Sequence, residues 1–84
     1  MLQTATMIEP AQIRAARALL GWKQTDLAAA SGISEMSIKN VEKAGSDPRS
    51  STLRAIQEAF ERAGVVFLDA GQNREGGAGV RLQE

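Results

Sequence analysis

Residues 24–42 read QTDLAAASGISEMSIKNVE, and this stretch decides the fold. It predicts a helix over 24–31, a sharp turn at Gly32, and a second helix over about 35–44 that Ser34 caps and Gly45 ends. A helix of about eight residues, a turn containing glycine and a second capped helix are together typical of a helix-turn-helix. The residues expected to face inward are Leu27, Ala28, Ile33, Ile38 and Val41.

The segments on either side predict two more helices. Pro10 suits the first position of a helix because its missing N–H would be unpaired there, and Gly21 is placed to end that helix. A last helix is expected from about Ser51 to Ala63, after the turn that Asp47-Pro48 forces. Spacing of i, i+3 and i+7 marks the buried faces, formed by Ile13, Ala16 and Leu20 in the first helix and by Leu53, Ile56 and Phe60 in the last.

The end of the chain has a different pattern. Two β-prone runs predict strands at about 65–69 and 79–83, joined by a glycine-rich flexible loop in an antiparallel hairpin. A lone hairpin is marginal in water. Its apolar residues therefore either cover the helical core or build a dimer sheet through an exposed edge, and these residues are Val65, Phe67, Val80 and Leu82. The expected fold class is mainly α, with a compact four-helix domain over 9–63 and a C-terminal β-hairpin extension over 64–84.

Composition excludes most enzymes. The chain has 84 residues, the size of one small domain, and contains no Cys and no His. Thiolate chemistry, the commonest general base and the commonest neutral metal ligand are thus missing, and no nucleophile is spaced with a base. We predict no catalytic residue, no metal site and no cofactor. Apolar runs fall short of the roughly 20 residues that span a bilayer, and no secretory signal pattern is visible, so a cytoplasmic chain is expected.

The ten Lys and Arg residues balance the ten Asp and Glu residues, but the charges are unevenly distributed. Between Pro10 and Arg54, seven cations and four anions give a net charge of +3. From Ala55 to Glu84, three cations and five anions give −2, and Glu9 supplies the remaining −1. The segment with the helix-turn-helix is therefore the positive part of the chain, which suits a nucleic-acid partner.

Three ordered motifs lie within residues 10–63: RAARALLGWKQTDLA at 14–28, SGIS at 31–34 and SIKNVE at 37–42. Together they resemble the λ-repressor-like, Cro/XRE-type family of helix-turn-helix transcriptional regulators. The resemblance implies a four-helix DNA-binding domain that acts as a homodimer on double-stranded DNA, as a repressor at the nucleoid. It places the helix over about 35–44 in the major groove.

The resemblance also assigns roles to individual residues. It implies that Gln24 contacts a phosphate and braces the first base-reading side chain. Asn40 can bond adenine, Met36 can pack on a thymine methyl group and Glu35 can accept from cytosine. The expected base-contacting residues are Glu35, Met36, Lys39 and Asn40. The expected phosphate-contacting residues are Lys23, Gln24, Ser34, Ser37, Lys43 and Arg49. Arg17 and Glu42 match a structural ion pair of the family.

Two other functions stay open. An antitoxin-like protein would use the C-terminal strands to bind a toxin-like partner protein as well as DNA. An adaptor without DNA affinity is favoured by Glu35, which would face a polyanion, and by the zero net charge. Lys23 also departs from the family, whose members often have a capping Ser, Thr or Asn there. Trp22 is expected to pack or cap between the first two helices, with a surface contact as the alternative.

Overall fold

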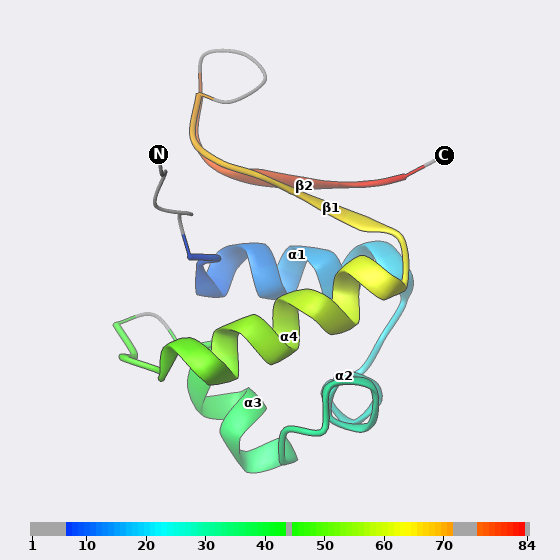
Figure 1. Ribbon diagram of the computed structural model, residues 1–84, viewed down its shortest axis with the longest axis vertical. Helices are drawn as coiled ribbons and strands as arrows, with labels where there is room; N and C mark the ends of the chain where they lie inside the picture. Colours follow the sequence, from blue (N-terminus) through cyan, green and yellow to red (C-terminus); the bar gives the residue numbers. More distant parts are fainter. Residues whose placement is uncertain (1–6, 44, 72–75, 84) are drawn as a thin grey trace.

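The computed structural model describes residues 7–43, 45–71 and 76–83 of the chain. In these residues the elements follow the order α1 (Pro10–Leu20), α2 (Gln24–Ser31), α3 (Glu35–Val41), α4 (Ser50–Arg62), β1 (Val65–Leu68) and β2 (Gly79–Leu82). The predicted mainly helical class with a C-terminal hairpin is confirmed. Figure 1 shows the hairpin over α1 and α4, with α3 at the opposite end of the molecule. No helix in the described ranges is long and apolar enough to cross a membrane.

Glycines in the left-handed conformation end the first two helices. Gly21 has φ 68° and Gly32 has φ 77°, a region that side chains with a Cβ rarely adopt. The N–H of Gly32 donates to the carbonyl of Ala28 at 2.9 Å, which closes α2. Two residues later, the Ser34 hydroxyl accepts from the N–H of Ser37 at 3.1 Å and caps α3. The short turn predicted from the sequence is therefore present, with the expected cap.

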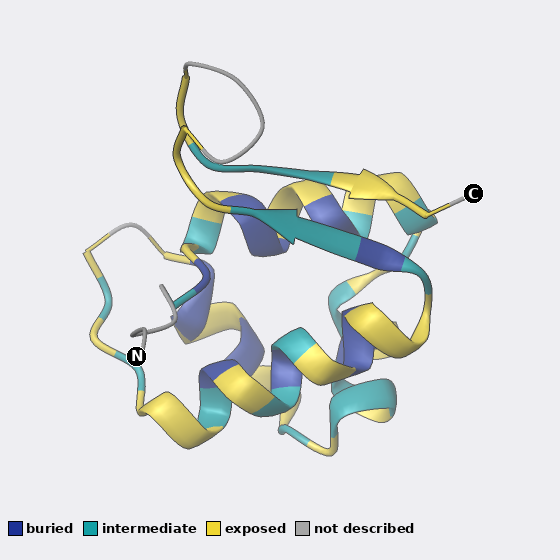
Figure 2. Cartoon of the chain, turned by 45° about the horizontal axis from the view of Figure 1, so that its top comes forward, coloured by how far each residue is buried: buried dark blue, intermediate teal, exposed yellow. Residues whose placement is uncertain are grey.

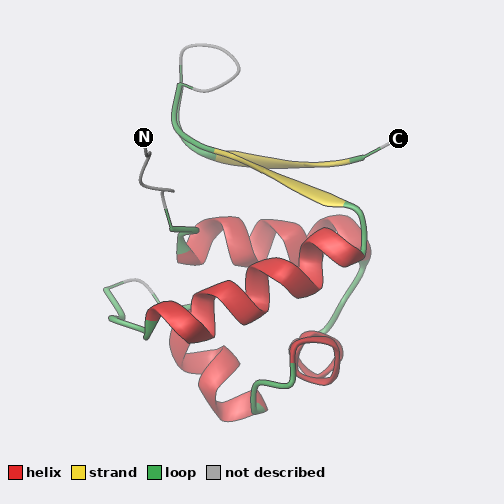
Figure 3. Cartoon of the chain, in the orientation of Figure 1, coloured by secondary structure: helices red, strands yellow, loops and turns green. Residues whose placement is uncertain are grey.

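The predicted extent of α3 was wrong. The helix ends at Val41, and Glu42 follows it as the cap, so residues 42–43 lie beyond the helix and residue 44 lies outside the described residues. The carbonyls at this end have other partners, since the Ser46 hydroxyl donates to Val41 and Arg14 donates to Glu42. Gly45 has φ 82° but belongs to the loop that joins α3 to α4, which Figure 3 shows.

Smaller corrections concern the other ends. The last helix was expected over Ser51 to Ala63, and α4 runs from Ser50 to Arg62. Both strands stop one residue before the expected ends at 69 and 83. The observed ladder pairs Val65 with Leu82 and Leu68 with Gly79 in an antiparallel register.

A single core lies between the helices and the hairpin, as the dark blue residues of Figure 2 show. At its centre is Phe60, which is fully buried. The Trp22 ring stacks on Phe60 with centroids 5.6 Å apart, so packing is the role of this tryptophan, and Phe67 meets Phe60 edge-on at 5.9 Å. The buried apolar residues are Ile8, Ile13, Ala16, Leu27, Ile38, Val41, Leu53, Ile56, Ala59, Phe60 and Val65. Leu20, Ala28 and Ile33, expected inside, are only half-buried at its margin.

The hairpin covers this core with one of its faces. Residues directly opposite each other in an antiparallel pair share a face, so Val65, Phe67, Val80 and Leu82 lie on the same side. The first of these is buried, and Phe67 and Val80 pack against the core. Leu82 is still 45% exposed. The covering role is therefore what the structure shows for three of the four residues.

One buried polar side chain, missed from the sequence, ties the hairpin to α1. Gln12 is 5% exposed, and its amide nitrogen donates to the carbonyls of Leu68 at 3.2 Å and Gly79 at 3.1 Å. Its amide oxygen accepts from the N–H of Glu9 at 2.8 Å. A glutamine three residues after a helix cap is the capping-box position, and this was the only local signal in the sequence.

We expect Gln12→Met to lower the free energy of unfolding by about 1–3 kcal/mol, because it keeps the volume and removes three hydrogen bonds. Urea denaturation followed by Trp22 fluorescence measures this loss. Gln57→Met is the matched control, since Gln57 makes one exposed bond to Glu61 on α4, and it should change stability by less than about 0.5 kcal/mol. Equal effects of the two variants would contradict the role of Gln12.

Candidate nucleic-acid interface

The outer side of α3 carries all four residues predicted to face bases. Glu35, Met36, Lys39 and Asn40 are exposed, and Met36, at 70%, is the most exposed of the large apolar residues that the structure describes. The opposite side of the helix is buried through Ile38 and Val41. The helix therefore presents one polar face with a single apolar side chain, and a major groove offers partners for both kinds.

The two charged residues of this face lie beside each other. The Lys39 ammonium is 3.7 Å from the Glu35 carboxylate, one helical turn earlier, and both side chains are about half exposed. Such an exposed pair contributes little to stability, roughly 0.3–0.5 kcal/mol. The Lys39 ammonium offsets the negative charge of Glu35 at the start of α3. Because the pair is weak, Lys39 can exchange it for a contact with a base or a phosphate. The repulsion expected from Glu35 is thereby reduced.

The two serines at the start of α3 differ in what they can still bond. The Ser34 hydroxyl accepts from the N–H of Ser37 and lies 3.0 Å from the Ser37 hydroxyl, to which it donates. Its one donor hydrogen is therefore used within the cap. The Ser37 hydroxyl accepts this bond and keeps its own hydrogen for an outside acceptor. Of the two serines predicted to contact phosphates, Ser37 is therefore the one with a hydrogen left to donate.

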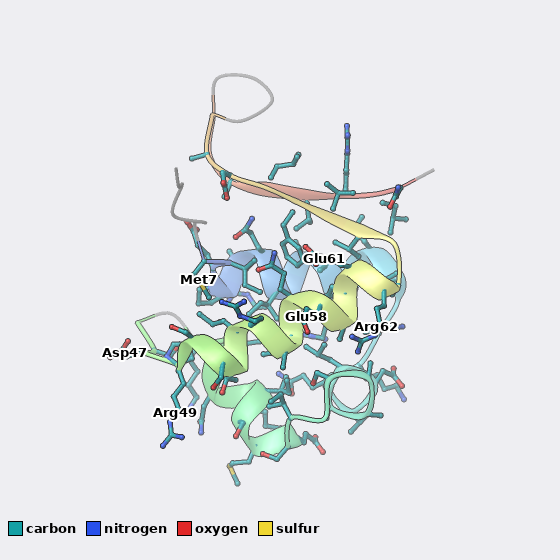
Figure 4. All side chains as sticks on the ribbon, in the orientation of Figure 1. Met7, Asp47, Arg49, Glu58, Glu61 and Arg62 are labelled. Atoms are coloured by element: carbon teal, nitrogen blue, oxygen red, sulfur yellow. The ribbon has the colours of Figure 1, made fainter. Side chains whose placement is uncertain are left out.

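Three exposed cations stand at the ends of α2, α3 and α4. Lys23 precedes α2, Lys43 follows α3, and Arg49 is the residue before α4. None of them forms an ion pair with a described residue. Figure 4 shows Arg49 extending from the start of α4 on the side of the molecule where α3 lies. Free cations around a polar helix are the arrangement that binds a phosphate backbone.

An open groove runs between α3 and the start of α4. Its volume is about 400 Å³, and it is lined by Ser37, Asn40, Val41, Ser46, Asp47, Pro48, Arg49 and Thr52. The groove thus joins a predicted base contact, Asn40, to a predicted phosphate contact, Arg49. The Ser37 and Thr52 hydroxyl groups can donate to an anion, while the Ser46 hydroxyl is used by Val41 and the Asp47 carboxylate repels an anion. It suits a backbone that passes along its rim better than an enclosed anion.

A buried ion pair holds the end of α3. Glu42 is 6% exposed, and its carboxylate accepts two bonds from the Arg17 guanidinium, Nε to Oε2 at 2.6 Å and Nη2 to Oε1 at 2.9 Å. Arg17 also donates to the carbonyl of Trp22 at 3.2 Å, and Arg14 donates to the carbonyl of Glu42. Parallel bonds between guanidinium and carboxylate fix direction as well as distance. The pair therefore sets the angle of α3 relative to α1.

Gln24 belongs to the same network. Its amide nitrogen donates to Glu42 Oε1 at 3.1 Å. One of its two N–H groups is thus used inside the protein, and the other can still donate to a phosphate. The phosphate contact of Gln24 stays a prediction, and the structure adds a bond that joins the start of α2 to the end of α3.

The N-terminal cap of α2 was predicted in part: the missing bond from Lys23 was expected, and the bond to Asp26 was not. As expected, the Lys23 side chain, which has no acceptor, makes no capping bond. The Asp26 carboxylate instead accepts from the backbone N–H of Lys23 at 2.8 Å. The aspartate occupies the third helical position, where acidic residues also interact favourably with the helix dipole. This partner compensates for the missing serine and leaves the Lys23 side chain free to point outward.

The family of the chain emerges from comparison with known proteins. The family model described as Helix-turn-helix matches residues 13–64, which is more than half of the chain and includes α2, α3 and α4. No curated protein matches. The hairpin lies outside the matched range, apart from its preceding turn. In the ranges that the structure describes, no three acidic side chains gather in a group that could hold a metal ion.

We expect Arg17→Met to lower the free energy of unfolding by about 3–5 kcal/mol, because it leaves the Glu42 carboxylate buried without its charged partner. Chemical denaturation measures the loss. Lys39→Met is the matched control: it breaks the exposed pair with Glu35 and should cost less than about 0.5 kcal/mol. A loss for Arg17→Met as small as that of the control would show that the ion pair does not hold α3.

Proposed function

Because the chain belongs to the Cro/C1-type helix-turn-helix family of DNA-binding transcription regulators, we propose that it is a repressor that reads a specific operator as a homodimer. Helix α3 enters the major groove of double-stranded DNA in this proposal. The observation that supports it is the single exposed face of α3, on which Glu35, Met36, Lys39 and Asn40 stand together. Family membership makes DNA the partner, and this face supplies the chemistry to read it.

Base reading falls mainly to Asn40 and Met36. An asparagine side chain can bond the N6 and N7 atoms of one adenine at the same time, which distinguishes adenine from the other bases. Met36 gives apolar contact for a thymine methyl group, and at 70% exposure it is open to such a contact. Glu35 accepts from cytosine, with Lys39 beside it to offset repulsion by the phosphates.

Phosphate contacts position the helix in the groove. Lys23, Lys43 and Arg49 approach from three sides, and the Ser37 hydroxyl adds a donor at the start of α3. Gln24 donates its free N–H to a phosphate while its other N–H bonds Glu42. These contacts carry no sequence information, so they supply affinity on every duplex.

The small size of the reading helix explains the need for two copies. Seven residues of α3 contact only a few base pairs, too few to select one site in a genome. A homodimer doubles the site and places two reading helices about one turn of DNA apart. Repression then needs no further activity, since a dimer on a promoter competes with polymerase for the same DNA.

We expect Asn40→Ala and Lys43→Ala to weaken DNA binding in different ways. The operator is first selected from a randomised duplex library, and affinities are then measured by mobility shift at several salt concentrations. Asn40→Ala should reduce the preference for the operator by about 1–3 kcal/mol at one base position. Lys43→Ala should weaken all duplexes alike and reduce the salt dependence by about one released ion.

Arg81→Ala is the matched control for charge, because it removes one exposed cation from the hairpin, on the side of the molecule away from α3. It should leave both the base preference and the salt dependence unchanged. Retention of no duplex by the wild-type protein at low salt would contradict the proposal itself. Equal losses of Asn40→Ala and Lys43→Ala on all duplexes would contradict the roles assigned to the two residues.

A further inference from the structure

Met36 is the most accessible easily oxidised side chain among the described residues. The chain has three methionines, one tryptophan and no cysteine, so no thiol competes with a thioether for an oxidant. Met1 lies outside the described residues, and Met7 is half-buried against the core, as is Trp22. Met36 is 70% exposed. Of the described residues, Met36 is therefore the one that an oxidant in solution reaches first.

The sulfur stands on the exposed face of α3, where the base contacts are predicted. Met36 is followed one helical turn later by Lys39 and Asn40, and side chains three and four positions apart in a helix lie beside each other. The opposite side of the same helix is buried through Ile38 and Val41. A chemical change at the sulfur therefore alters the exposed face without opening the core.

A sulfoxide at this position gives the face a different chemistry. A thioether is apolar and a weak hydrogen-bond acceptor, whereas the S=O group is polar and accepts strongly. Asn40 has a donor to offer it, since no described residue bonds the Asn40 side-chain amide. A bond from Asn40 to the sulfoxide oxygen would use the N–H that adenine N7 requires. A polar group would also replace the apolar contact for a thymine methyl group.

We propose that Met36 is an oxidation site through which hypochlorous acid releases the protein from its operator. The inference rests on the proposed function, since it names a regulation of the same DNA-binding face. Oxidation converts the one apolar side chain of this face into a polar one beside Asn40. Methionine sulfoxide reductases reverse such a change, so release is reversible without new synthesis of the protein.

The oxidation is a two-electron step at sulfur. The sulfur lone pair of Met36 attacks the chlorine atom of hypochlorous acid, the Cl–O bond breaks and hydroxide leaves. Water then adds to sulfur as chloride leaves. Loss of two protons, one of them to the released hydroxide, gives the sulfoxide. Sulfur has then lost two electrons, and chlorine has gained them as chloride.

The predicted phosphate contacts keep their chemistry after this step. Lys23, Lys43 and Arg49 stand at the ends of the helices, and a sulfoxide carries no net charge. Binding to a duplex of unrelated sequence depends on such cations rather than on Met36. Oxidation therefore removes the preference for the operator, and the oxidised protein keeps the weak binding that all duplexes share.

Mass spectrometry of the full-length protein and its peptides tests the site. After treatment with a limiting amount of hypochlorous acid, sulfoxide should accumulate at Met36 before it accumulates at Met7. Operator duplex should slow oxidation of Met36 and leave that of Met7 unchanged, because DNA covers the exposed face of α3. Equal rates at the two residues in the free protein would overturn the site. An unchanged rate at Met36 in the complex would overturn the contact on which release depends.

Mobility shift tests the consequence, with each protein compared before and after treatment. Oxidised wild type should bind the operator roughly 10-fold or more weakly, the loss of one good base contact, and an unrelated duplex as before. A methionine sulfoxide reductase should restore the affinity. Met36→Leu keeps an apolar side chain without sulfur, so its own affinity should survive the treatment. Met7→Leu is the matched control and should respond as the wild type does. Circular dichroism checks that all proteins stay folded.

The outcomes separate this proposal from the proposed function. A wild type that keeps its operator affinity with Met36 fully oxidised would overturn the release and leave the repressor standing. An equal loss in Met36→Leu would place the damage elsewhere and would also overturn it. Retention of no duplex by the untreated wild type would contradict the repressor and the release together. A reversible loss that is confined to the operator and absent from Met36→Leu would support both.

Discussion

The ion pair between Arg17 and Glu42 is the constraint on which the orientation of the exposed face of α3 depends. Helix α3 has only seven residues, and isolated helices shorter than about 12 residues are marginal in water. Ile38 and Val41 attach α3 to the core, but apolar contacts allow rotation about the helix axis. The two parallel bonds to Glu42, with Gln24 on the same carboxylate, remove that freedom. The direction in which Asn40 points is thus set two residues away from it.

A buried ion pair is a costly way to hold a helix. Desolvation of two charges offsets most of their attraction, and well-packed apolar residues often give equal or greater stability. The benefit here is geometric, because a carboxylate that accepts three bonds tolerates one arrangement of α1, α2 and α3. All of its partners come from within 30 residues of chain and from the segment with net positive charge. The ion pair thus contributes a fixed orientation of the residues predicted to contact bases more than it contributes stability.

Capping and turn residues predicted most of the helices. They failed where contacts between residues far apart in the chain determine the structure. Gly32 and Ser34 fix the turn by backbone conformation and capping, which depend only on neighbours. The predicted end of α3 was wrong, and the carbonyls at this end bond to the nearby Ser46 and to Arg14, which is 28 residues from Glu42. Gln12 was missed because its partners are 56 and 67 residues away in the chain. The base contacts came from the family resemblance, since periodicity alone shows exposure and not what an exposed residue binds.

The zero net charge is the sum of a positive helix-turn-helix segment and a negative C-terminal segment. A chain with three excess cations on the DNA side gains little from bulk attraction, so one copy binds any duplex weakly. In the proposed homodimer, specific affinity must then come from the predicted base contacts of both copies. Phe60 connects the two ends, because Trp22 stacks on it from the helix-turn-helix side and Phe67 meets it from the hairpin. The hairpin is therefore built on the same core that supports α3, and one aromatic cluster contacts both ends of the molecule.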